Sequence, residues 1–473
     1  MNATLPDSNV RPPDWRDFRD HIATADAAGR RRWLYPRQPK GRFYERRKAV
    51  SWVLLAALFA GPFIKINGNP LLMINLVTRR FSVLGHIFWP QDMALVAIAL
   101  LLYFTSIMIF TAAYGRLWCG WVCPQTLLME MVFRRIEYGI EGDGRAQRAL
   151  AQGPWNARKI RLRIFKHTAF FALSFVISNL LLSYIIGIDQ LTVIVTDPPA
   201  RHLEGLGFML AFTGLFYAIF ARFREQACTF ICPYGRLQST VLDENTIVVA
   251  YDYKRGEKRA PVSARAVGGA GDCVDCKLCV AVCPTGIDIR DGIQMECVNC
   301  TACMDACDSV MSRRSRPAGL IRYASLNAIE KGQKFRLTPR MLGYAGLLLT
   351  LASLLVFLVL TRPDVEATLL RAPGSLFQTL PGGRLENLYT LQLVNKTSRP
   401  IPVQLKLEDV PGKLTLMGRA HLVVPKEELA ETSVLIELAP ELVSHGQKQF
   451  HIGVYADGRR LQTVRASFLG PRD

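Results

Sequence analysis

No long apolar run lies within the first 48 residues of the chain, which are largely polar and contain 12 of its Lys and Arg residues. A cleaved secretory signal carries an apolar stretch of about 7–15 residues close behind a charged start. The sequence therefore predicts no cleaved signal peptide. We expect the first apolar run, which begins at Ala49, to stay in the protein as a membrane anchor.

Carboxylates are scarce relative to cationic side chains: 39 Asp and Glu residues stand against 58 Lys and Arg residues, a formal net charge of +19. Residues 363–473 are nearly balanced, with 13 cationic and 12 acidic side chains, so +18 of this charge belongs to residues 1–362. Such an uneven distribution is typical of the cytoplasmic segments of membrane proteins. The charge therefore gives no reason to expect a nucleic-acid partner.

Cysteine is missing from residues 364–473, which excludes the inter-sheet disulfide of antibody domains. About seven short β-rich runs in roughly 110 residues nevertheless predict an all-β, immunoglobulin-like sandwich. Asp457-Gly458 suits a two-residue hairpin turn within it. The predicted strands are Leu388–Val394, Val403–Leu407, Lys413–Met417, His421–Val424, Ser433–Leu438, Gln449–Tyr455 and Gln462–Phe468.

What the chain does have is apolar residues gathered into blocks, as expected for membrane spans. A helix needs roughly 20 apolar residues to cross a bilayer. Five blocks approach or reach this length, although the fourth is short and needs Gly205–Arg222 to cross. The blocks are Ala49–Ile66, Met93–Tyr114, His167–Ile188, Leu206–Phe220 and Met341–Leu360.

The positions of Lys and Arg predict how these spans are oriented, because cytoplasmic loops are enriched in both. We expect a multi-domain membrane protein of the bacterial inner membrane, with a cytoplasmic N-terminus and a periplasmic C-terminal domain. The predicted parts are a basic cytoplasmic segment (1–48), four transmembrane helices in two hairpins (49–223), a cytoplasmic region (224–340), a fifth transmembrane helix (341–361) and the periplasmic sandwich (362–473).

Eight of the twelve cysteines form two sets with the same spacing, C-x2-C-x2-C-x3-C, within about residues 268–312. This is the bacterial ferredoxin pattern for two 4Fe–4S clusters, in which the fourth cysteine of each set binds the other cluster. Zinc sites use two pairs of ligands, and disulfides are disfavoured in the cytoplasm. The predicted ligands are Cys273, Cys276, Cys279 and Cys307 for one cluster, and Cys297, Cys300, Cys303 and Cys283 for the other.

The other four cysteines form two C-x-x-x-C-P motifs, Cys119 with Cys123 and Cys228 with Cys232, each after a predicted hairpin of spans. This arrangement predicts an internal repeat that brings four thiols together. The prolines that follow Cys123 and Cys232 suit the first position of a helix, whose positive N-terminus favours thiolate. Three interpretations remain open: buried structural thiols, a dithiol/disulfide couple, or a site for a soft metal ion such as Cu(I).

Three charged residues near these features have weaker expected roles. Arg116 and Arg236 flank the thiol motifs and could lower the pKa of the thiols, although cytoplasmic loops carry arginine in any case. Asp92 directly precedes the second predicted span, and we expect it to cap that helix rather than to carry protons.

Three segments together resemble the CcoG family, also called FixG or RdxA. They are GRLWCGWVCPQTLLME (115–130), CPYGRLQSTVLDENTIVVAYDYKRGEKR (232–259) and CPTGIDIRDGIQMECVNCTACMDACD (283–308). The family comprises membrane-bound iron–sulfur accessory proteins of the cbb-type cytochrome c oxidase. The resemblance implies a cupric reductase that supplies Cu(I) for the oxidase's copper–haem centre. It also implies that the family's four membrane-edge thiols, which would be catalytic and bind copper, are Cys119, Cys123, Cys228 and Cys232 here.

The resulting hypothesis is electron flow from a cytoplasmic donor, through two 4Fe–4S clusters, to copper at the thiol pairs. Its expected partners are copper ions, the membrane, the donor, and assembly factors of the cbb-type oxidase or a copper transporter or chaperone; a homodimer is one option for its assembly. Two alternatives stay open. One is a quinol-linked membrane ferredoxin that transfers electrons, and the other is a non-catalytic assembly scaffold whose clusters sense redox state.

Overall fold

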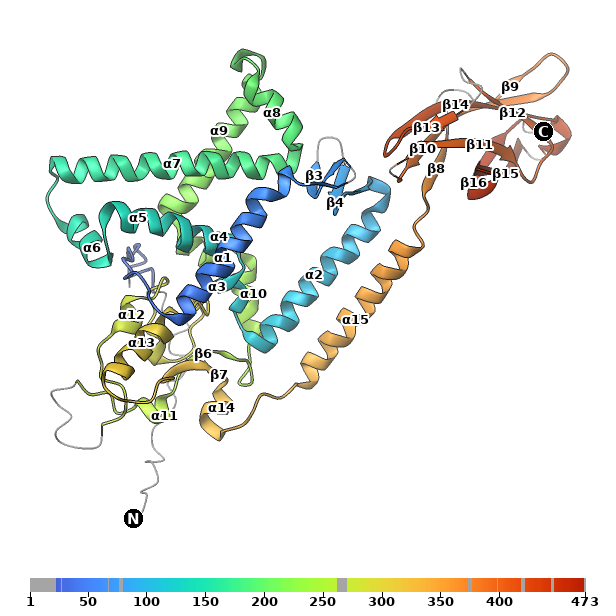
Figure 1. Ribbon diagram of the computed structural model, residues 1–473. Coiled ribbons are helices and arrows are strands. Elements are labelled where there is room, and N and C mark those ends of the chain that lie inside the picture. Colours follow the sequence, from blue (N-terminus) through green and yellow to red (C-terminus); the bar gives the residue numbers. More distant parts are fainter. Residues whose placement is uncertain are drawn as a thin grey trace. The chain divides into compact units, whose positions relative to one another are not determined.

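The computed structural model describes residues 23–471, except 27, 67, 76–79, 262–269, 373, 375–376, 398, 418–421 and 444–445. The chain divides into two compact units, and each is treated by itself. The first unit comprises Met1–Pro62 and Ala97–Ser353, and the second comprises Phe63–Val96 and Leu354–Asp473. Figure 1 shows the elements of both.

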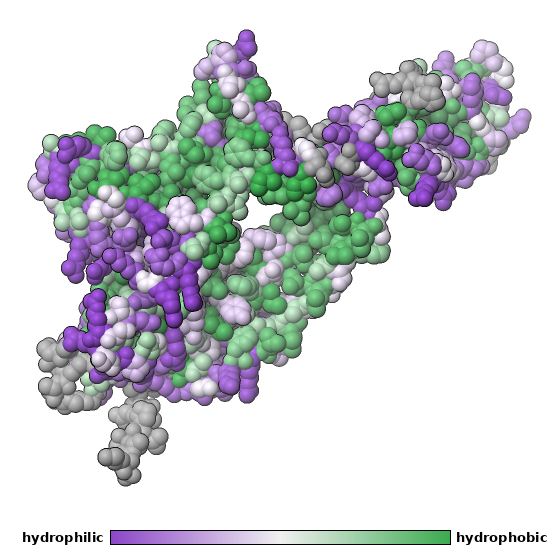
Figure 2. All heavy atoms as spheres, viewed as in Figure 1, coloured by the Kyte–Doolittle hydropathy of each residue, from purple (hydrophilic) through white to green (hydrophobic). Residues whose placement is uncertain are grey.

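Four helices of the described residues are long and apolar enough to cross a membrane. They are α2 (Met93–Tyr114), α7 (Ala157–Ile186), α9 (Leu203–Ala218) with its π-helical continuation η5 (Ile219–Phe223), and α15 (Pro339–Leu360). They correspond to four of the five predicted spans. Their side chains form hydrophobic surface in Figure 2, as a lipid-facing helix requires. Exposed examples are Leu100, Phe104, Phe171, Phe208, Leu349 and Phe357.

The first predicted span differs from the structure. Helix α1 (Arg42–Ala60) starts earlier than the apolar block and ends before it is complete. Beyond Ala60 the chain forms a 3₁₀ turn (Gly61–Phe63) and strand β1 (Lys65–Ile66), because Pro62 has no N–H to continue the helical hydrogen bonds. Asp305 holds the start of α1, because its carboxylate accepts hydrogen bonds from the backbone N–H groups of Phe43 (3.1 Å) and Tyr44 (2.8 Å).

Short elements make up the rest of the first unit, and an antiparallel β-strand pair, β6 with β7, lies in its cysteine-rich part. Phe133 stacks on Phe220 at 4.3 Å between ring centroids and meets Phe170 edge-on at 4.9 Å, in a core that joins the segment after the first thiol motif to α7 and η5. The elements are α3 (Leu117–Trp121), α4 (Pro124–Leu127), η3 (Leu128–Phe133), α5 (Arg134–Glu141), α6 (Gly144–Gln152), α8 (Ile188–Thr196), η4 (Pro199–Arg201), η6 (Ala227–Ile231), α10 (Pro233–Val241), β6 (Val248–Tyr251), α11 (Tyr253–Gly256), α12 (Leu278–Ala281), η8 (Ile289–Asp291), α13 (Ala302–Arg313), β7 (Ile321–Ala324) and α14 (Leu326–Lys331).

The second unit is a β-sandwich with a small β-structure formed by residues 65–88. One sandwich sheet has the order β12-β14-β10-β8, with β9 also paired to β10, and the other has the order β13-β11-β15-β16. Its strands are β8 (Val365–Arg371), β9 (Gln378–Thr379), β10 (Leu385–Asn395), β11 (Ile401–Leu407), β12 (Gly412–Leu416), β13 (Leu422–Val424), β14 (Leu429–Leu438), β15 (Gln447–Ala456) and β16 (Arg459–Leu469). Strands β1 and β2 (Asn69–Pro70) pair, as do β3 (Leu72–Asn75), β4 (Arg80–Val83) and β5 (His86–Phe88) in that order.

Every one of the seven predicted strands has a counterpart among β10 to β16, although His421 lies outside the described residues. Apolar residues of both sheets fill one core, including the fully buried Val365, Val434 and Phe450. The predicted hairpin turn is confirmed: Asp457 and Gly458 have φ of 47° and 76° between β15 and β16. The prediction missed β8 and β9.

Asp92 directly precedes α2 and contacts two other segments of the second unit. It is the last residue of a 3₁₀ turn, η2 (Pro90–Asp92), and accepts the N–H of Trp89 at 3.1 Å, so it caps the turn that leads into α2. Its carboxylate also pairs with Arg362 at 2.6 Å and Lys396 at 2.7 Å. Burial alone would raise the pKa of Asp92, but the hydrogen bonds from these two cations outweigh it and lower the pKa.

Replacing Asp92 with Asn should therefore destabilise the β-sandwich unit by about 3 kcal/mol, because Arg362 and Lys396 lose the buried carboxylate that they share and Lys396 keeps only the partly exposed Glu366. In the unchanged protein this contribution is complete above the unfolded-state pKa of about 3.9 and is lost as the pH falls through the lowered folded-state pKa. Thermal unfolding followed from pH 7 to pH 3 measures both effects. Glu366→Gln is the control, since Glu366 touches Lys396 alone and is partly exposed. Equal unfolding temperatures for Asp92→Asn and the control would contradict the assignment.

Candidate metal and electron-transfer site

The first thiol motif directly follows α2. Gly115 ends that helix with a φ of 57°, and an added Cβ would lie 2.7 Å from Val248 Cγ1, so the turn requires glycine. Cys119 lies in α3, and Cys123 immediately precedes Pro124, the first residue of α4. The predicted position of this proline at a helix start, where an N–H would lack a partner, is confirmed.

The second thiol motif repeats this local structure after α9 and η5. Cys228 lies in the single π-helical turn η6, and Cys232 immediately precedes Pro233, the first residue of α10. Cys123 and Cys232 have ψ of 123° and 114°, the extended conformation that a following proline imposes. Both motifs thus place one thiol in a helical turn and the other at the start of the next helix.

The two motifs meet, so that their four thiols interact. Cys119 interacts electrostatically with Cys123 and Cys232, and Cys228 interacts with the other three. Burial, reinforced by the neighbouring thiols, raises the pKa of Cys228 to about 12, and burial also raises that of Cys119. Among the described residues, no group of three or more His, Cys, Asp or Glu side chains is arranged to hold a metal ion.

Arg116 contacts both thiol motifs and the cysteine-rich module. The charge of the buried guanidinium opposes the rise in the pKa of Cys119, and the side chain donates a hydrogen bond to the carbonyl of Met295. An added Cβ on Gly235 of the second motif would lie 3.2 Å from Arg116 Nη2. Arg236, by contrast, is exposed on α10. The charge of Arg116 acts on Cys119 and on Cys228.

The remaining eight cysteines line two cavities, grouped as the crossed ligand pattern predicts, except that Cys279 reaches both. The Cys276 cavity is lined by Cys273, Cys276, Cys279 and Cys307. The Cys300 cavity is lined by Cys283, Cys297, Cys300 and Cys303, together with Cys279. Apolar side chains, among them those of Val249, Ile287 and Ile289, form much of the remaining wall of the Cys300 cavity. Cavities that combine four thiols with apolar walls fit iron–sulfur clusters.

Both cysteine loops have the same backbone shape around their middle cysteine. The residues just before and after Cys276, Asp275 and Lys277, have φ of 49° and 55°. Those around Cys300, Asn299 and Thr301, have φ of 53° and 66°. Non-glycine residues rarely adopt positive φ, and such conformations persist where the surrounding structure imposes them, often at functional sites. The two cavities are therefore built by equivalent loops, each followed by a helix, α12 or α13.

The Cys300 cavity lies directly against the first thiol motif. Gly120, next to Cys119, packs so closely on this loop that an added Cβ would lie 2.3 Å from the Val298 carbonyl oxygen and 3.1 Å from the Cys300 nitrogen. Arg47 of α1 donates to the Gly120 carbonyl at 2.6 Å. Burial raises the pKa of Cys300 to about 11, and the charge of Arg47 opposes this. The charged half of α1 therefore belongs to this site.

Arg134 connects both thiol motifs to the loop of Cys283. This fully buried side chain pairs with Glu130 at 2.6 Å, seven residues after Cys123, and with Glu225 at 3.4 Å, three residues before Cys228. It also donates to the carbonyl of Pro284 at 3.0 Å. Buried charges persist when they are paired and hydrogen-bonded in this way.

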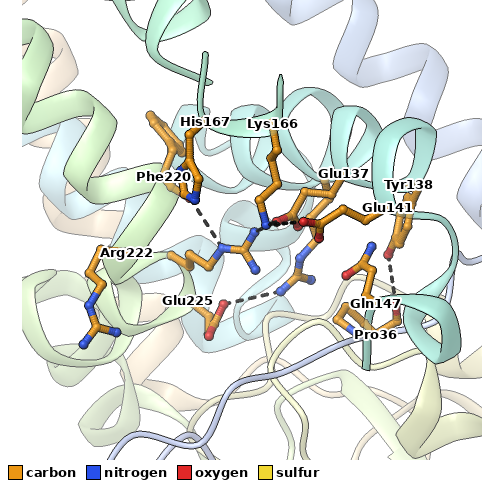
Figure 3. Close-up of polar contacts among 12 residues, drawn as sticks. Pro36, Glu137, Tyr138, Glu141, Gln147, Lys166, His167, Phe220, Arg222 and Glu225 are labelled. Atoms are coloured by element: carbon orange, nitrogen blue, oxygen red, sulfur yellow. Dashed lines mark hydrogen bonds and ion pairs between the residues drawn. The ribbon is translucent and has the colours of Figure 1, made fainter. Parts of the chain in front are cut away.

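Further ion pairs extend this buried network to α7. Figure 3 shows Glu137 and Glu141 of α5 facing Lys166 of α7, at 3.4 and 3.0 Å. Arg224, just after η5, pairs with Glu137 as well. The network therefore joins the segments that follow the first thiol motif and precede the second.

Sequence reasoning missed four residues of this site: Gly120, Arg47, Arg134 and Asn299. The Asn299 side chain donates to the Tyr114 carbonyl at 3.3 Å and accepts the Val249 N–H at 3.1 Å. Gly120 could have been suspected, because a glycine between two functional cysteines suggests close backbone approach. The other three carry no local pattern that distinguishes them from ordinary polar residues.

Three family models match the chain. A 4Fe-4S binding domain matches residues 96–141, a 4Fe-4S dicluster domain matches residues 223–326, and the IG-like fold at the C-terminal of FixG, described as an oxidoreductase, matches residues 355–471. The predicted iron–sulfur domains and C-terminal fold are thus confirmed at this level.

Relatives cover most of the chain. "Nitrogen fixation protein FixG" of Rhizobium meliloti is 34% identical over 425 residues, which is 81% of this chain and 80% of the relative. "Protein RdxA" of Cereibacter sphaeroides is 35% identical over 478 residues, covering 93% of this chain and 97% of the relative. "Protein RdxB" of the same organism is 33% identical over 425 residues, with 85% and 87% covered.

Proposed function

Because this chain belongs to the FixG family, also called RdxA or CcoG, we propose that it is a membrane-bound cupric reductase that supplies Cu(I) for assembly of a cbb-type cytochrome c oxidase. The observation that carries this proposal is the close packing of the Cys300 loop on Gly120, beside four thiols from two motifs. A cupric reductase needs soft ligands for Cu(I) next to a source of electrons. This arrangement meets both needs.

The proposed cluster ligands are the cysteines that line each cavity. We assign Cys273, Cys276, Cys279 and Cys307 to one 4Fe–4S cluster and Cys283, Cys297, Cys300 and Cys303 to the other. When bound, such clusters supply one-electron transfer. The chain itself supplies the cysteines, the apolar walls and the backbone contact between the Cys300 loop and Gly120.

Copper enters this scheme as the substrate. One electron leaves a reduced carrier, which is oxidised, and one Cu(II) becomes Cu(I) at Cys119, Cys123, Cys228 and Cys232. Thiols that bind Cu(I) as thiolates release their protons, and the fixed charge of Arg116 beside Cys119 stabilises the resulting negative charge. An oxidase assembly factor, copper chaperone or transporter is the proposed recipient of Cu(I).

The test is metal turnover by the purified protein. Because dithionite reduces Cu(II) directly, the protein is first reduced with dithionite, freed of the reagent by desalting and only then mixed with Cu(II). The reduced clusters should convert Cu(II) to Cu(I), measured with a Cu(I)-specific chelator, and renewed reduction of the protein should allow further rounds. Reduction of the clusters by a quinol, without Cu(II) turnover, would instead favour the quinol-linked electron carrier. Binding of oxidase assembly factors with neither reaction would favour the scaffold.

A second candidate role for the thiol pairs is a third iron–sulfur cluster. The 4Fe-4S binding domain matched at 96–141 contains Cys119 and Cys123 as its only cysteines, and soft thiolates bind iron–sulfur centres as well as copper. Iron content separates the two candidates. Two clusters give about eight iron atoms per chain, and three give about twelve.

For the membrane topology we propose five crossings, with α1 as the first, both cysteine cavities in the cytoplasm and the β-sandwich in the periplasm. The charge bias of residues 1–362 supports this orientation. Helix α1 contains 19 residues, about 28 Å of helix. Its first turns carry charged residues, among them Arg47, which donates to the Gly120 carbonyl. Its apolar part, Ala49–Ala60, is therefore shorter than in the other four.

A reporter enzyme that is active only in the periplasm should be active when fused after Asp473 and inactive when inserted near Gly269. Both fusion points lie outside the described residues. The positive-inside bias predicts this pattern. A cytoplasmic reporter at the same two points serves as the control and should give the opposite pattern. Periplasmic activity near Gly269 would place the clusters outside and overturn the proposed orientation.

A further inference from the structure

The Cys276 cavity opens to solvent on the side that does not meet the thiol motifs. Among the twelve cysteines, Cys276 alone is exposed. The Cys300 cavity, in contrast, borders Gly120 and Arg47 through its loop. Under the proposed function the two cavities thus have different neighbours: one faces solvent, and the other faces the copper site.

One exposed cation lines the Cys276 cavity, and four more lie in segments that adjoin its lining. Lys277 follows Cys276 in the loop, and Arg313 and Arg314 end helix α13, whose Cys307 lines the cavity. Lys254 and Lys258 flank it in the segment that pairs with the residues before Cys273: the Gly271 N–H donates to the Lys258 carbonyl at 3.0 Å, and the Cys273 N–H donates to the Gly256 carbonyl at 3.4 Å. We call the surface formed by Lys254, Lys258, Cys276, Lys277, Arg313 and Arg314 the Cys276 face.

Two acidic residues near this face are paired with other arginines, whereas a third, Asp308, accepts the N–H of Gly319 at 2.8 Å. Asp272 pairs with Arg255 at 2.5 Å and with Arg316, and Asp275 pairs with Arg290 at 2.5 Å. Within the described part of the chain, no carboxylate forms an ion pair with the five cations of the Cys276 face. The surface around the one exposed cysteine is therefore positively charged.

We propose that the Cys276 face docks a small, acidic protein that carries one electron. The proposal rests on the proposed function and names the class of its cytoplasmic donor. Complementary charge steers such an encounter and orients the partners, even when the interface itself is weak. The reduced carrier gives up one electron and is oxidised, and one Cu(II) is reduced to Cu(I) at the thiol pairs.

An anionic lipid surface would also attract cations, but exposed arginines within the apolar helices are better placed for that contact. Arg158 and Arg161 are exposed in the first turns of α7, one of the four apolar helices. The cations of the Cys276 face instead adjoin the cavity of a solvent-exposed cluster ligand. This placement favours a redox protein over a lipid headgroup.

The test uses the full chain with its clusters, in lipid nanodiscs, and a plant-type 2Fe–2S ferredoxin of strongly negative charge as the probe. We expect the ferredoxin to bind in low salt and to lose affinity steeply as ionic strength rises, because salt screens exposed charges. Arg313→Glu/Arg314→Glu and Lys254→Glu/Lys258→Glu should each weaken binding at least about tenfold. Arg158→Glu/Arg161→Glu is the matched control and should bind as the parent does. Iron content and cluster absorbance confirm that each variant is assembled.

Equal ferredoxin affinity in the parent and both Cys276-face variants would overturn the proposal. So would charge-dependent binding of the face to vesicles of phosphatidylglycerol with no binding of ferredoxin, because the partner would then be a membrane. Cu(II) reduction by the dithionite-reduced, desalted parent protein is measured separately. If that reaction fails while ferredoxin still binds through the Cys276 face, the copper function is wrong and the docking surface stands.

Discussion

Replacing Cys119 and Cys123 with serine should abolish copper binding and leave both iron–sulfur clusters assembled, and so should the same change at Cys228 and Cys232. Serine preserves size and polarity but lacks the soft thiolate that holds Cu(I). Replacing one pair should be enough to abolish copper binding, because the thiols of the two motifs interact with one another. Removing a residue that only hydrogen-bonds to a metal ligand lowers metal affinity by up to about 100-fold. Removing two ligands themselves should therefore lower the copper affinity by at least on the order of 100-fold.

Copper content and Cu(II) reduction of the purified variants are the deciding measurements, with iron content as the control. A structural role of the thiols predicts lower protein yield with copper binding intact. A dithiol couple predicts a disulfide on oxidation with no copper present. If the thiols hold a third cluster, the variants lose about a third of their iron. A variant in which all four of these cysteines are replaced by serine should bind no copper. Copper binding equal to that of the parent would rule out the copper site.

The parts of this site that the sequence predicted depend on local rules. Four thiols in fixed spacing belong to one loop whatever the rest of the chain does, so the grouping of the eight cysteines into two cavities could be predicted. Proline after Cys123 and after Cys232 likewise starts a helix for reasons within one turn of chain. Apolar length identified α2, α7, α9 and α15.

The parts that the sequence did not predict are contacts between distant segments. Arg134 reaches a carbonyl 150 residues away, and Gly120 is fixed by a loop that begins near Val298. The thiol pKa values show the same limitation. The helix N-termini led us to expect thiolates at Cys123 and Cys232. Burial raises the pKa of the other two thiols, Cys119 and Cys228, and that burial depends on which segments cover them.

The end of α1 illustrates a competition between two signals. Its apolar block was long enough to predict a span to Ile66, yet Pro62 ends the helical hydrogen bonding within that block. At its other end the helix extends beyond the apolar block and includes charged residues. One of them, Arg47, donates a hydrogen bond to the Gly120 carbonyl. Hydropathy alone cannot detect this, since it treats each charge as a boundary.

Changing Cys283 to Ala should remove the cluster of the Cys300 cavity and lower the iron content by about half, from about eight atoms to about four. Cys283 belongs to the first cysteine set in the sequence, but its side chain lines the cavity of the second set. Double variants give the sharpest measurement. In a Cys300→Ser background the additional change at Cys283 should cost no more iron, because both residues serve one cluster.

In a Cys276→Ser background, which damages the other cluster, the same change at Cys283 should remove nearly all remaining iron, because Cys276 lines the opposite cavity. Iron content and low-temperature electron paramagnetic resonance of the five variants, three single and two double, read out both predictions. The reverse pattern, with Cys283 additive to Cys300 and not to Cys276, would show that each cysteine set binds its own cluster. The cavities would then have grouped the thiols wrongly, and the electron path past Gly120 would begin from a different ligand set.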